Sequence, residues 1–119
     1  QILADKGYEH GVHEGLGWIG GSVKELETNG LCLPHIGWNN FNKLYGTPIM
    51  DGITSDMDFY YVHSYHFDVK DNSNIVATCE YGMEFAAAVN KENIYGVQFH
   101  PEKSQKAGRR LLQNFLRLS

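Results

Sequence analysis

This sequence contains few cysteines, no excess of basic residues and no long apolar run. Its two cysteines, Cys32 and Cys79, lie far apart. That spacing excludes the disulfide framework of small secreted domains and favours a reducing, cytoplasmic compartment. The net charge of -4 argues against a nucleic-acid-binding surface, which needs a basic face. No apolar stretch approaches the length of a membrane span, and the chain has neither internal repeats nor low-complexity segments.

What remains is a chain of globular composition, and its most informative stretch is the C-terminal one. The 119 residues suit a single domain with a core of its own. Ile94, Val97 and Phe99 predict a buried strand over Asn93–Phe99, in which Gly96 would let a neighbouring backbone come close. Pro101 ends that strand. From Gln105 the pattern is helical, with an apolar face made of Leu111, Leu112, Phe115 and Leu116.

The strand and the helix are joined by His100-Pro101-Glu102, which can support nucleophilic catalysis. An imidazole takes a proton from a thiol or hydroxyl near neutral pH and returns it to a leaving group. A carboxylate two residues later can hold the other ring nitrogen and stabilise the imidazolium. The alternative is structural: His100 would cap the strand, and Glu102 would favour the positive end of the helix dipole.

The rest of the chain predicts mostly strands and turns. The expected elements are a short helix at Gln1–Lys6, a glycine-rich loop over Tyr8–Gly21, a turn at Asn29-Gly30, strands at Leu31–Trp38 and Phe59–Phe67, and a hairpin of Ile75–Tyr81 with Met83–Val89 about Gly82. The hairpin and the last strand together predict an antiparallel meander. In Phe59–Phe67, alternate residues from Phe59 to Tyr65 should share one face.

Two other residue groups are candidates for chemical sites. His10 with His13, and His63 with His66, have the spacing of paired metal ligands on a helix. Neither pair lies in a predicted helix or beside further ligands, so we expect no metal site. Cys32 and Cys79 lie in strand-like surroundings, where we expect small buried apolar residues and not a nucleophile.

Three separated motifs resemble one known family. YGVQFHPEKS, followed by an amphipathic helix, resembles the C-terminal signature of class I (triad) glutamine amidotransferases. LPHIGWN at Leu33–Asn39 and FYYVHSY at Phe59–Tyr65 are similar to the glutaminase subunit of imidazole glycerol phosphate synthase in particular. The resemblance covers essentially the whole chain. It implies an α/β fold with a mixed sheet, antiparallel strands and a C-terminal helix, and it implies no cofactor.

The resemblance also implies roles for individual residues. His100 and Glu102 would assist a cysteine nucleophile, and Gln1 with the backbone of Ser64 and Tyr65 would hold glutamine. The residues expected to face a partner subunit are Trp38, Asn39, Tyr60 and Lys103. For Trp38 a place in the core is the alternative, since a lone tryptophan is usually buried.

One part of the family pattern is absent. The nucleophile of this family lies in a Gly-x-Cys-Leu-Gly-x-Gln turn, and this sequence opens on Gln1-Ile2-Leu3, which resembles the end of that turn and the start of its helix. We therefore expect residues 1–119 to be the C-terminal part of a single amidotransferase domain whose nucleophile-bearing part is missing. This polypeptide alone should not hydrolyse glutamine.

The implied function is hydrolysis of glutamine to glutamate and ammonia through a glutamyl thioester. The ammonia would pass to a (β/α)₈ barrel synthase subunit in a heterodimer that serves histidine biosynthesis. Three alternatives stay open: a glutaminase feeding a sugar amidotransferase of surface-polysaccharide synthesis, a non-catalytic scaffold that lost the nucleophile, and an amidotransferase domain of purine or pyrimidine synthesis. PHIGWN and VHSY argue against the last of these.

Overall fold

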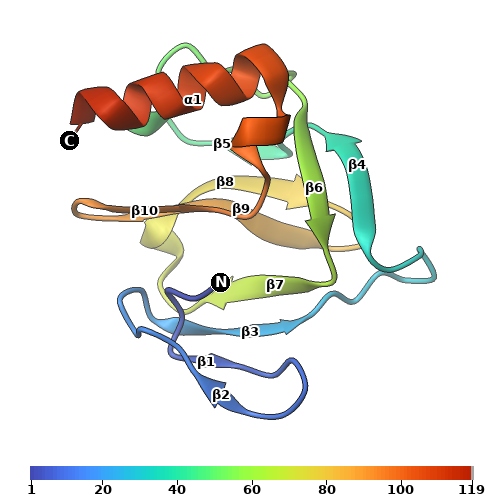
Figure 1. The fold of residues 1–119 in the computed structure, drawn as a ribbon. Helices are drawn as coiled ribbons and strands as arrows, with labels where there is room; N and C mark the ends of the chain where they lie inside the picture. The colour runs from blue at the N-terminus through green and yellow to red at the C-terminus, as the bar shows by residue number, and fades with distance from the viewer. Residues whose placement is uncertain (119) are drawn as a thin grey trace.

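The fold places three β-sheets on one side of a long C-terminal helix (Figure 1). It was obtained as a computed structural model, which describes residues 1–118. A mixed sheet has the order β2 (His13–Glu14), β1 (Lys6–Gly7), β3 (Gly21–Glu25) and β7 (Tyr65–Val69). An antiparallel sheet has the order β10 (Ile94–Val97), β9 (Glu84–Lys91), β8 (Ile75–Glu80) and β5 (Lys43–Leu44). The third sheet pairs β4 (His35–Asn39) with β6 (Phe59–His63).

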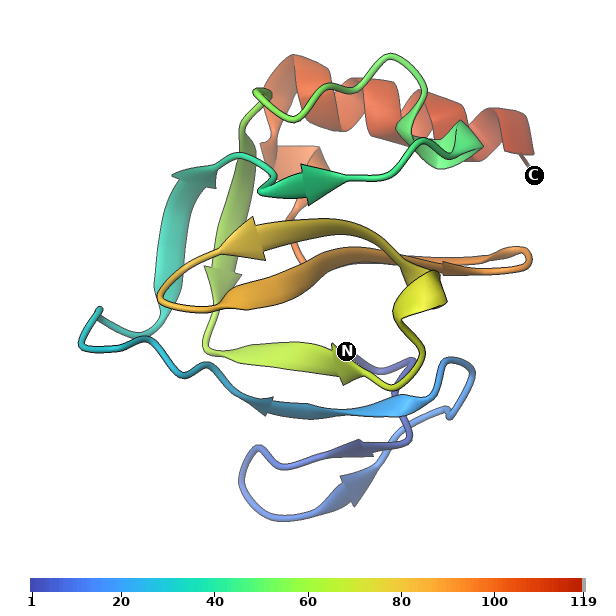
Figure 2. The same ribbon diagram turned by 180° about the vertical axis from the view of Figure 1, so that it is seen from behind.

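The helical segments complete an α/β fold of the predicted kind. They are the 3₁₀ turns η1 (Pro48–Met50), η2 (Asn72–Asn74) and η3 (Pro101–Lys103), and the helix α1 (Gln105–Leu118). Seen from behind, the β8–β9 hairpin lies between α1 and the β3–β7 pair (Figure 2). No helix within residues 1–118 has both the length and the apolar character needed to cross a bilayer.

The predicted meander of β8, β9 and β10 is confirmed. Its first turn depends on Gly82, which has a φ of +74° and lies against Thr28. A Cβ atom on Gly82 would be 2.2 Å from the Thr28 carbonyl oxygen, so any other residue there would force the two loops apart. The glycine therefore holds the hairpin against the loop that follows β3.

The aromatic strand predicted over Phe59–Phe67 is instead two strands that break at Ser64. β6 pairs with β4, and β7 pairs with β3. Up to His63 the predicted alternation is correct, because Phe59, Tyr61 and His63 are all buried. Beyond the break the Ser64 carbonyl accepts a hydrogen bond from Leu26 N at 2.9 Å, and the chain changes sheets. Ser64 and Tyr65 therefore lie at a corner between two sheets.

Two apolar clusters hold the sheets together. The larger is centred on Phe59, Tyr61 and Phe99, with the rings of Phe59 and Phe99 4.4 Å apart, and it includes Leu111 of α1. The smaller joins Phe67 of the mixed sheet and Ile19 of the loop before β3 to Ala86 and Val89 of β9. Because Phe99 directly precedes His100, the larger cluster fixes the start of the His-Pro-Glu segment.

Helix α1 forms where predicted, but a different face of it is buried. Of the expected apolar face only Leu111 is buried, while Leu112, Phe115 and Leu116 are 41, 43 and 71% exposed. The buried positions beside Leu111 are Gly108, whose Cβ would lie 1.9 Å from the Pro101 carbonyl oxygen, and Asn114. Close approach at a glycine and polar contacts at an asparagine thus orient the helix.

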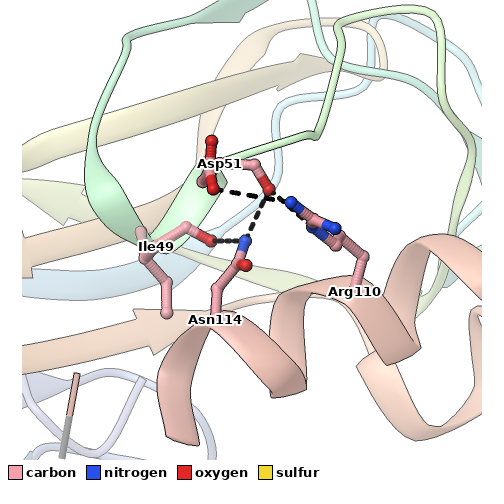
Figure 3. Close-up of polar contacts among 4 residues, drawn as sticks. All are labelled: Ile49, Asp51, Arg110 and Asn114. Carbon is pink, nitrogen blue, oxygen red and sulfur yellow. Dashed lines mark hydrogen bonds and ion pairs between the residues drawn. The ribbon is translucent and has the colours of Figure 1, made fainter. Parts of the chain in front are cut away.

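The contacts of Asn114 and Arg110 fix α1 against the segment around η1 (Figure 3). The Asn114 side-chain amide donates to the carbonyls of Ile49 and Asp51, at 2.9 and 2.8 Å. Arg110 Nε donates to the same Asp51 carbonyl at 3.0 Å, and its guanidinium lies 3.4 Å from the Asp51 carboxylate. Asn114 is 2% exposed, and its hydrogen bond to the Ile49 carbonyl is buried, whereas the Arg110 contacts are exposed.

The predicted helix at Gln1–Lys6 is wrong. These residues form a turn that leads into β1. The carbonyls of Ile2 and Ala4 accept hydrogen bonds from Leu16 N and Gly17 N, and the Leu3 carbonyl accepts from the loop as well. Pairing with this distant loop replaces the local hydrogen bonds of a helix.

Three further expectations need correction. The strand predicted over Leu31–Trp38 begins only at His35, and Cys32 lies exposed in the preceding loop. The last strand ends at Val97 and is half-buried along its length. Gly96 approaches the side chains of Leu3 and Val89, and not a backbone as expected.

Candidate active site

His100 and Glu102 form a pair at the junction of β10 and α1. His100 precedes η3 with extended backbone angles, and its Nδ1 lies 3.4 Å from Glu102 Oε1. The histidine side chain is 40% exposed and the glutamate 60%. With Nδ1 directed at the carboxylate, Nε2 is the ring nitrogen that remains available to another partner.

Backbone contacts with Tyr60 hold this pair in place. The Tyr60 carbonyl accepts from His100 N at 2.9 Å, and Tyr60 N donates to Ser104 Oγ at 3.0 Å. Ser104 Oγ in turn donates to the His100 carbonyl at 2.6 Å. Ser104 is 2% exposed, and η3 lies beside β6 (Figure 1). Ser104 was not predicted from the sequence, because a serine before a helix usually acts as a cap and nothing local reveals a distant partner.

A cavity of about 400 Å³ brings together the residues predicted to hold glutamine. Gln1 Nε2 donates to the Tyr65 carbonyl at 3.0 Å and to Gln98 Oε1 at 2.9 Å. The first residues of the chain thus lie beside β7 (Figure 1). The cavity lining consists of Gln1, Glu9, Pro34, Val62, His63, Ser64, Tyr65 and Gln98.

Glu9 and Gln98 were not predicted as parts of this cavity. Glu9 lies in a glycine-rich loop whose pattern indicated no more than a connection. Gln98 is two residues before His100, so the cavity and the His-Pro-Glu segment share one stretch of backbone. The cavity therefore offers the carboxylate of Glu9, the carboxamides of Gln1 and Gln98, and the backbone of Ser64 and Tyr65. These groups are suited to a small zwitterion that carries an amide.

Two buried histidines are associated with the cavity: His63 is part of its lining, and His35 contacts His63. His35 Nδ1 is 3.0 Å from His63 Nε2, and His63 Nδ1 is 2.7 Å from the Tyr65 carbonyl oxygen. Burial, and then the neighbouring His63, lower the pKa of His35 to about 4. Burial is also the main cause that lowers the pKa of His63, and His100 contributes in the same direction. Both rings are therefore neutral at pH 7.

The histidine pairs with the spacing of metal ligands are used otherwise. Both ring nitrogens of His63 have protein partners, and His66 points into a separate buried site on β7. His13 Nε2 lies 3.1 Å from the His10 carbonyl. Among the described residues 1–118, no three His, Cys, Asp or Glu side chains gather in a position to hold a metal ion.

The residues expected at a partner interface lie near one another, but they do not all face the same way. Trp38 and Tyr60 are opposite each other on β4 and β6, with ring centroids 5.6 Å apart. Trp38 is 49% exposed, so it is not a core residue. Lys103 is exposed in η3. Asn39 instead turns inward, where its amide donates to the Glu80 carbonyl at 3.0 Å and lies 3.5 Å from His35 Nε2.

Neither cysteine is placed as a nucleophile. Cys79 is buried in β8, where burial raises the pKa of its thiol to about 11 despite the opposing effect of the Tyr61 hydroxyl. Cys32 is exposed in the loop before β4, in contrast to its predicted burial. Within residues 1–118, no hydrogen bond joins either thiol to His100.

Comparison with known proteins shows the family to which this chain belongs. The model of the class-I glutamine amidotransferase family matches residues 19–118, so the chain belongs to that family. The chain is also 47% identical to the imidazole glycerol phosphate synthase subunit HisH of Pelagibacter ubique, over 99% of this chain and 58% of that protein. With HisH of Vibrio cholerae the identity is 52%, over 87% of this chain and 50% of the relative.

A solved structure supports the fold independently. A putative GMP synthase component from Thermoplasma acidophilum superposes with a TM-score of 0.66 at 20% identity, over 82% of this chain and 48% of its own. This similarity concerns the fold alone. The chain spans about three fifths of the length of the curated relatives that it matches.

Proposed function

We propose that this chain supplies the histidine, the glutamate and part of the glutamine pocket of a glutaminase, and that the intact protein is the glutaminase subunit of an imidazole glycerol phosphate synthase. The observation that carries the proposal is the contact between His100 and Glu102. Two residues before His100 in the sequence, Gln98 lines a cavity in which its side chain meets Gln1, and Gln1 also contacts the Tyr65 carbonyl. The names of the relatives at 45 to 52% identity support the assignment to histidine biosynthesis.

In the proposed reaction, His100 Nε2 takes the proton of a cysteine thiol, and the thiolate attacks the side-chain amide carbon of glutamine. The imidazolium then protonates the amide nitrogen, which leaves as ammonia, and a glutamyl thioester remains. A water molecule gives a proton to His100 and attacks the thioester. Glutamate leaves, and the proton on His100 returns to the thiolate. Glu102 holds Nδ1 throughout and favours the imidazolium.

The cavity provides contacts for the rest of the substrate. Gln1 and the Ser64–Tyr65 backbone can bind the amino-acid end of glutamine through amide and carbonyl groups. We assign Glu9 to the substrate α-ammonium, because it is the carboxylate in the cavity lining and a charge-assisted hydrogen bond is stronger than a neutral one. Because substrate binding needs no metal or cofactor at these contacts, none enters the scheme.

The partner would bind on the side where Trp38 and Lys103 are exposed and Tyr60 is half-buried. The exposed indole of Trp38 packs edge-on against Tyr60, and large aromatic side chains of this kind often dominate the energetics of interfaces. We propose a (β/α)₈ barrel synthase as the partner, which receives the ammonia. The side chain of Asn39 points inward and donates to the Glu80 carbonyl, so Asn39 would support this surface without contacting the partner.

We further propose that residues 1–119 form the C-terminal part of one amidotransferase domain, and that the nucleophile precedes Gln1 in the intact protein. The high pKa of Cys79 and the position of Cys32 support this proposal, since neither thiol is suited to the reaction. Residues 1–119 by themselves are then inactive. Glutamine hydrolysis by this polypeptide alone would contradict the assignment.

The test is glutamate release from glutamine by the full-length protein, with and without the synthase subunit. His100→Ala should reduce kcat by a factor of about 10³ or more, as loss of the general base does in related chemistry. Lys106→Ala, at an exposed position of α1, is the matched control and should leave kcat unchanged. A folded parent protein that binds the synthase but releases no glutamate would favour the scaffold alternative.

A further inference from the structure

The buried pair His35 and His63 has no part in the proposed proton transfers, although His63 lines the glutamine cavity and His35 contacts His63. His35 is 3% exposed and His63 7%. A buried polar side chain is costly unless its hydrogen bonds are satisfied. The hydrogen-bond partners of these rings therefore indicate what the pair does.

The partners fix one direction for the whole chain of hydrogen bonds. The Tyr65 carbonyl only accepts, so His63 Nδ1 carries the proton and donates to it at 2.7 Å. Since the ring is neutral, His63 Nε2 accepts, and His35 Nδ1 donates to it at 3.0 Å. His35 Nε2 is then an acceptor, directed at the Asn39 amide 3.5 Å away. No other pair of neutral tautomers satisfies these contacts.

Packing holds the two rings in this arrangement. His35 is stacked between Tyr81 and Tyr61, with centroids 4.1 and 4.9 Å away and interplanar angles of 19° and 21°. Phe85 lies 4.9 Å from the His63 ring. The rings cannot rotate without disturbing the core, so the hydrogen-bond direction is built into the fold.

The chain of hydrogen bonds ends on the carbonyl that also holds Gln1. Tyr65 O accepts from both His63 Nδ1 and Gln1 Nε2, which uses both of its lone pairs. This carbonyl belongs to the first residue of β7, directly after the corner at Ser64 where the chain changes sheets.

We propose that His35 and His63 are a positioning pair that sets the Ser64–Tyr65 backbone, and through it Gln1, for binding of glutamine. His63 acts directly on the Tyr65 carbonyl, and His35 acts through His63 by fixing its tautomer. The inference rests on the proposed glutaminase function. It extends that function by assigning substrate affinity to a buried pair of which only His63 borders the cavity.

Two substitutions separate the two nitrogens of His63. In His63→Asn the side-chain amide nitrogen lies near the place of Nδ1, so the hydrogen bond to Tyr65 remains while the acceptor for His35 is lost. His63→Gln does the reverse, because its amide oxygen can replace Nε2. We expect KM for glutamine to rise about tenfold in His63→Gln and less than about threefold in His63→Asn, with kcat changed less than KM in both, as loss of one buried hydrogen bond predicts.

His35→Phe tests whether His35 acts through the hydrogen bond to His63. The substitution keeps an aromatic ring between Tyr61 and Tyr81 but removes both ring nitrogens. We expect a rise in KM between those of the two His63 variants. Measurements use the full-length protein with its synthase subunit, and melting temperature is recorded for each variant. Equal KM values for His63→Asn and His63→Gln, or lowered melting temperatures with unchanged KM, would overturn the inference.

A second readout separates this inference from the proposed reaction. Glutamine affinity is measured by calorimetry in the same variants carrying His100→Ala, which stops turnover. If the protein with His100 intact binds glutamine without hydrolysing it, the proposed reaction is wrong. The difference in glutamine affinity between His63→Asn and His63→Gln then still shows whether the pair positions the backbone. If the parent protein binds no glutamine, both proposals are overturned.

Discussion

Ser104 and Tyr60 are joined by a hydrogen bond that fixes where His100 lies: Tyr60 N donates to Ser104 Oγ at 3.0 Å. The same hydroxyl donates to the His100 carbonyl, and the Tyr60 carbonyl accepts from His100 N. Tyr60 therefore gives both of its backbone groups to the turn that carries the proposed base. Because β6 carries Tyr60 and then continues to His63, one strand positions both the base and the substrate cavity.

Removal of the Ser104 hydroxyl should affect stability and turnover together. Ser104→Ala leaves the Tyr60 amide without its partner at a buried place, so we expect a loss of about 1–3 kcal/mol in the free energy of unfolding. Displacement of His100 should lower kcat for glutamine more than it raises KM. Urea unfolding and initial rates measure these effects. Ser55→Ala, at an exposed position, is the control; a Ser104→Ala variant with the parent's kcat would contradict the positioning role.

Glu9 should act on substrate binding alone. Glu9→Gln removes the charge assigned to the α-ammonium of glutamine, so we expect KM to rise about tenfold or more while kcat stays within about twofold. Steady-state rates over a range of glutamine concentrations give both constants. Glu14→Gln on β2 has the same change in charge outside the cavity and should leave KM unchanged. An equal shift in the two variants would point to a general effect of charge.

The buried histidines predict that acid destabilises the fold. The pKa of His35 is lowered from its ordinary value near 6.5 to about 4. Between these two pH values the unfolded chain binds a proton at His35 that the folded chain does not bind. The contribution of His35 to the free energy of unfolding is therefore fully present above pH 6.5 and is lost as the pH decreases toward 4. From pH 7 to pH 5 we expect His35 to contribute a loss of about 2 kcal/mol. The pKa values of His63 and His66 are lowered too, chiefly by burial, and add to this loss.

The contribution of His35 can be isolated with His35→Phe, which has no titrating group. Urea unfolding of the full-length protein at pH 7 and at pH 5 gives the loss of stability for each form. The variant should lose less between the two pH values than the parent, by roughly the 2 kcal/mol assigned to His35. An identical loss in both proteins would show that His35 does not titrate in this range.

The contacts of Asn114 should be worth more than those of any exposed polar residue on α1. Asn114→Ala removes two hydrogen bonds, which leaves the Ile49 carbonyl without its side-chain donor and the Asp51 carbonyl with Arg110 Nε alone, so we expect a loss of about 2–3 kcal/mol. Gln113→Ala, one position earlier and exposed, should change stability by less than about 0.5 kcal/mol. Thermal or urea unfolding measures both. Equal values would mean that water replaces the lost contacts.

Local signals in the sequence determined the elements that depend on near neighbours. The meander about Gly82, the helix from Gln105 and the alternation from Phe59 to His63 follow from residue preferences and from the 2- and 3.6-residue periods, and all were confirmed. The prediction that His100 and Glu102 are catalytic began from a local pattern too, in which two residue types suited to catalysis flank a proline between a strand and a helix, and the family resemblance strengthened it.

Tertiary structure alone decided the features that depend on distant partners. The segment from Gln1 to Lys6 is a turn because its carbonyls pair with residues 16–19, and α1 buries Asn114 because the η1 segment offers two carbonyls to it. His35 and His63 become one unit only when β4 and β6 pair in register. Sequence patterns describe short-range periodicity, whereas these contacts join groups tens of residues apart, so the fold had to bring them together before their role could be seen.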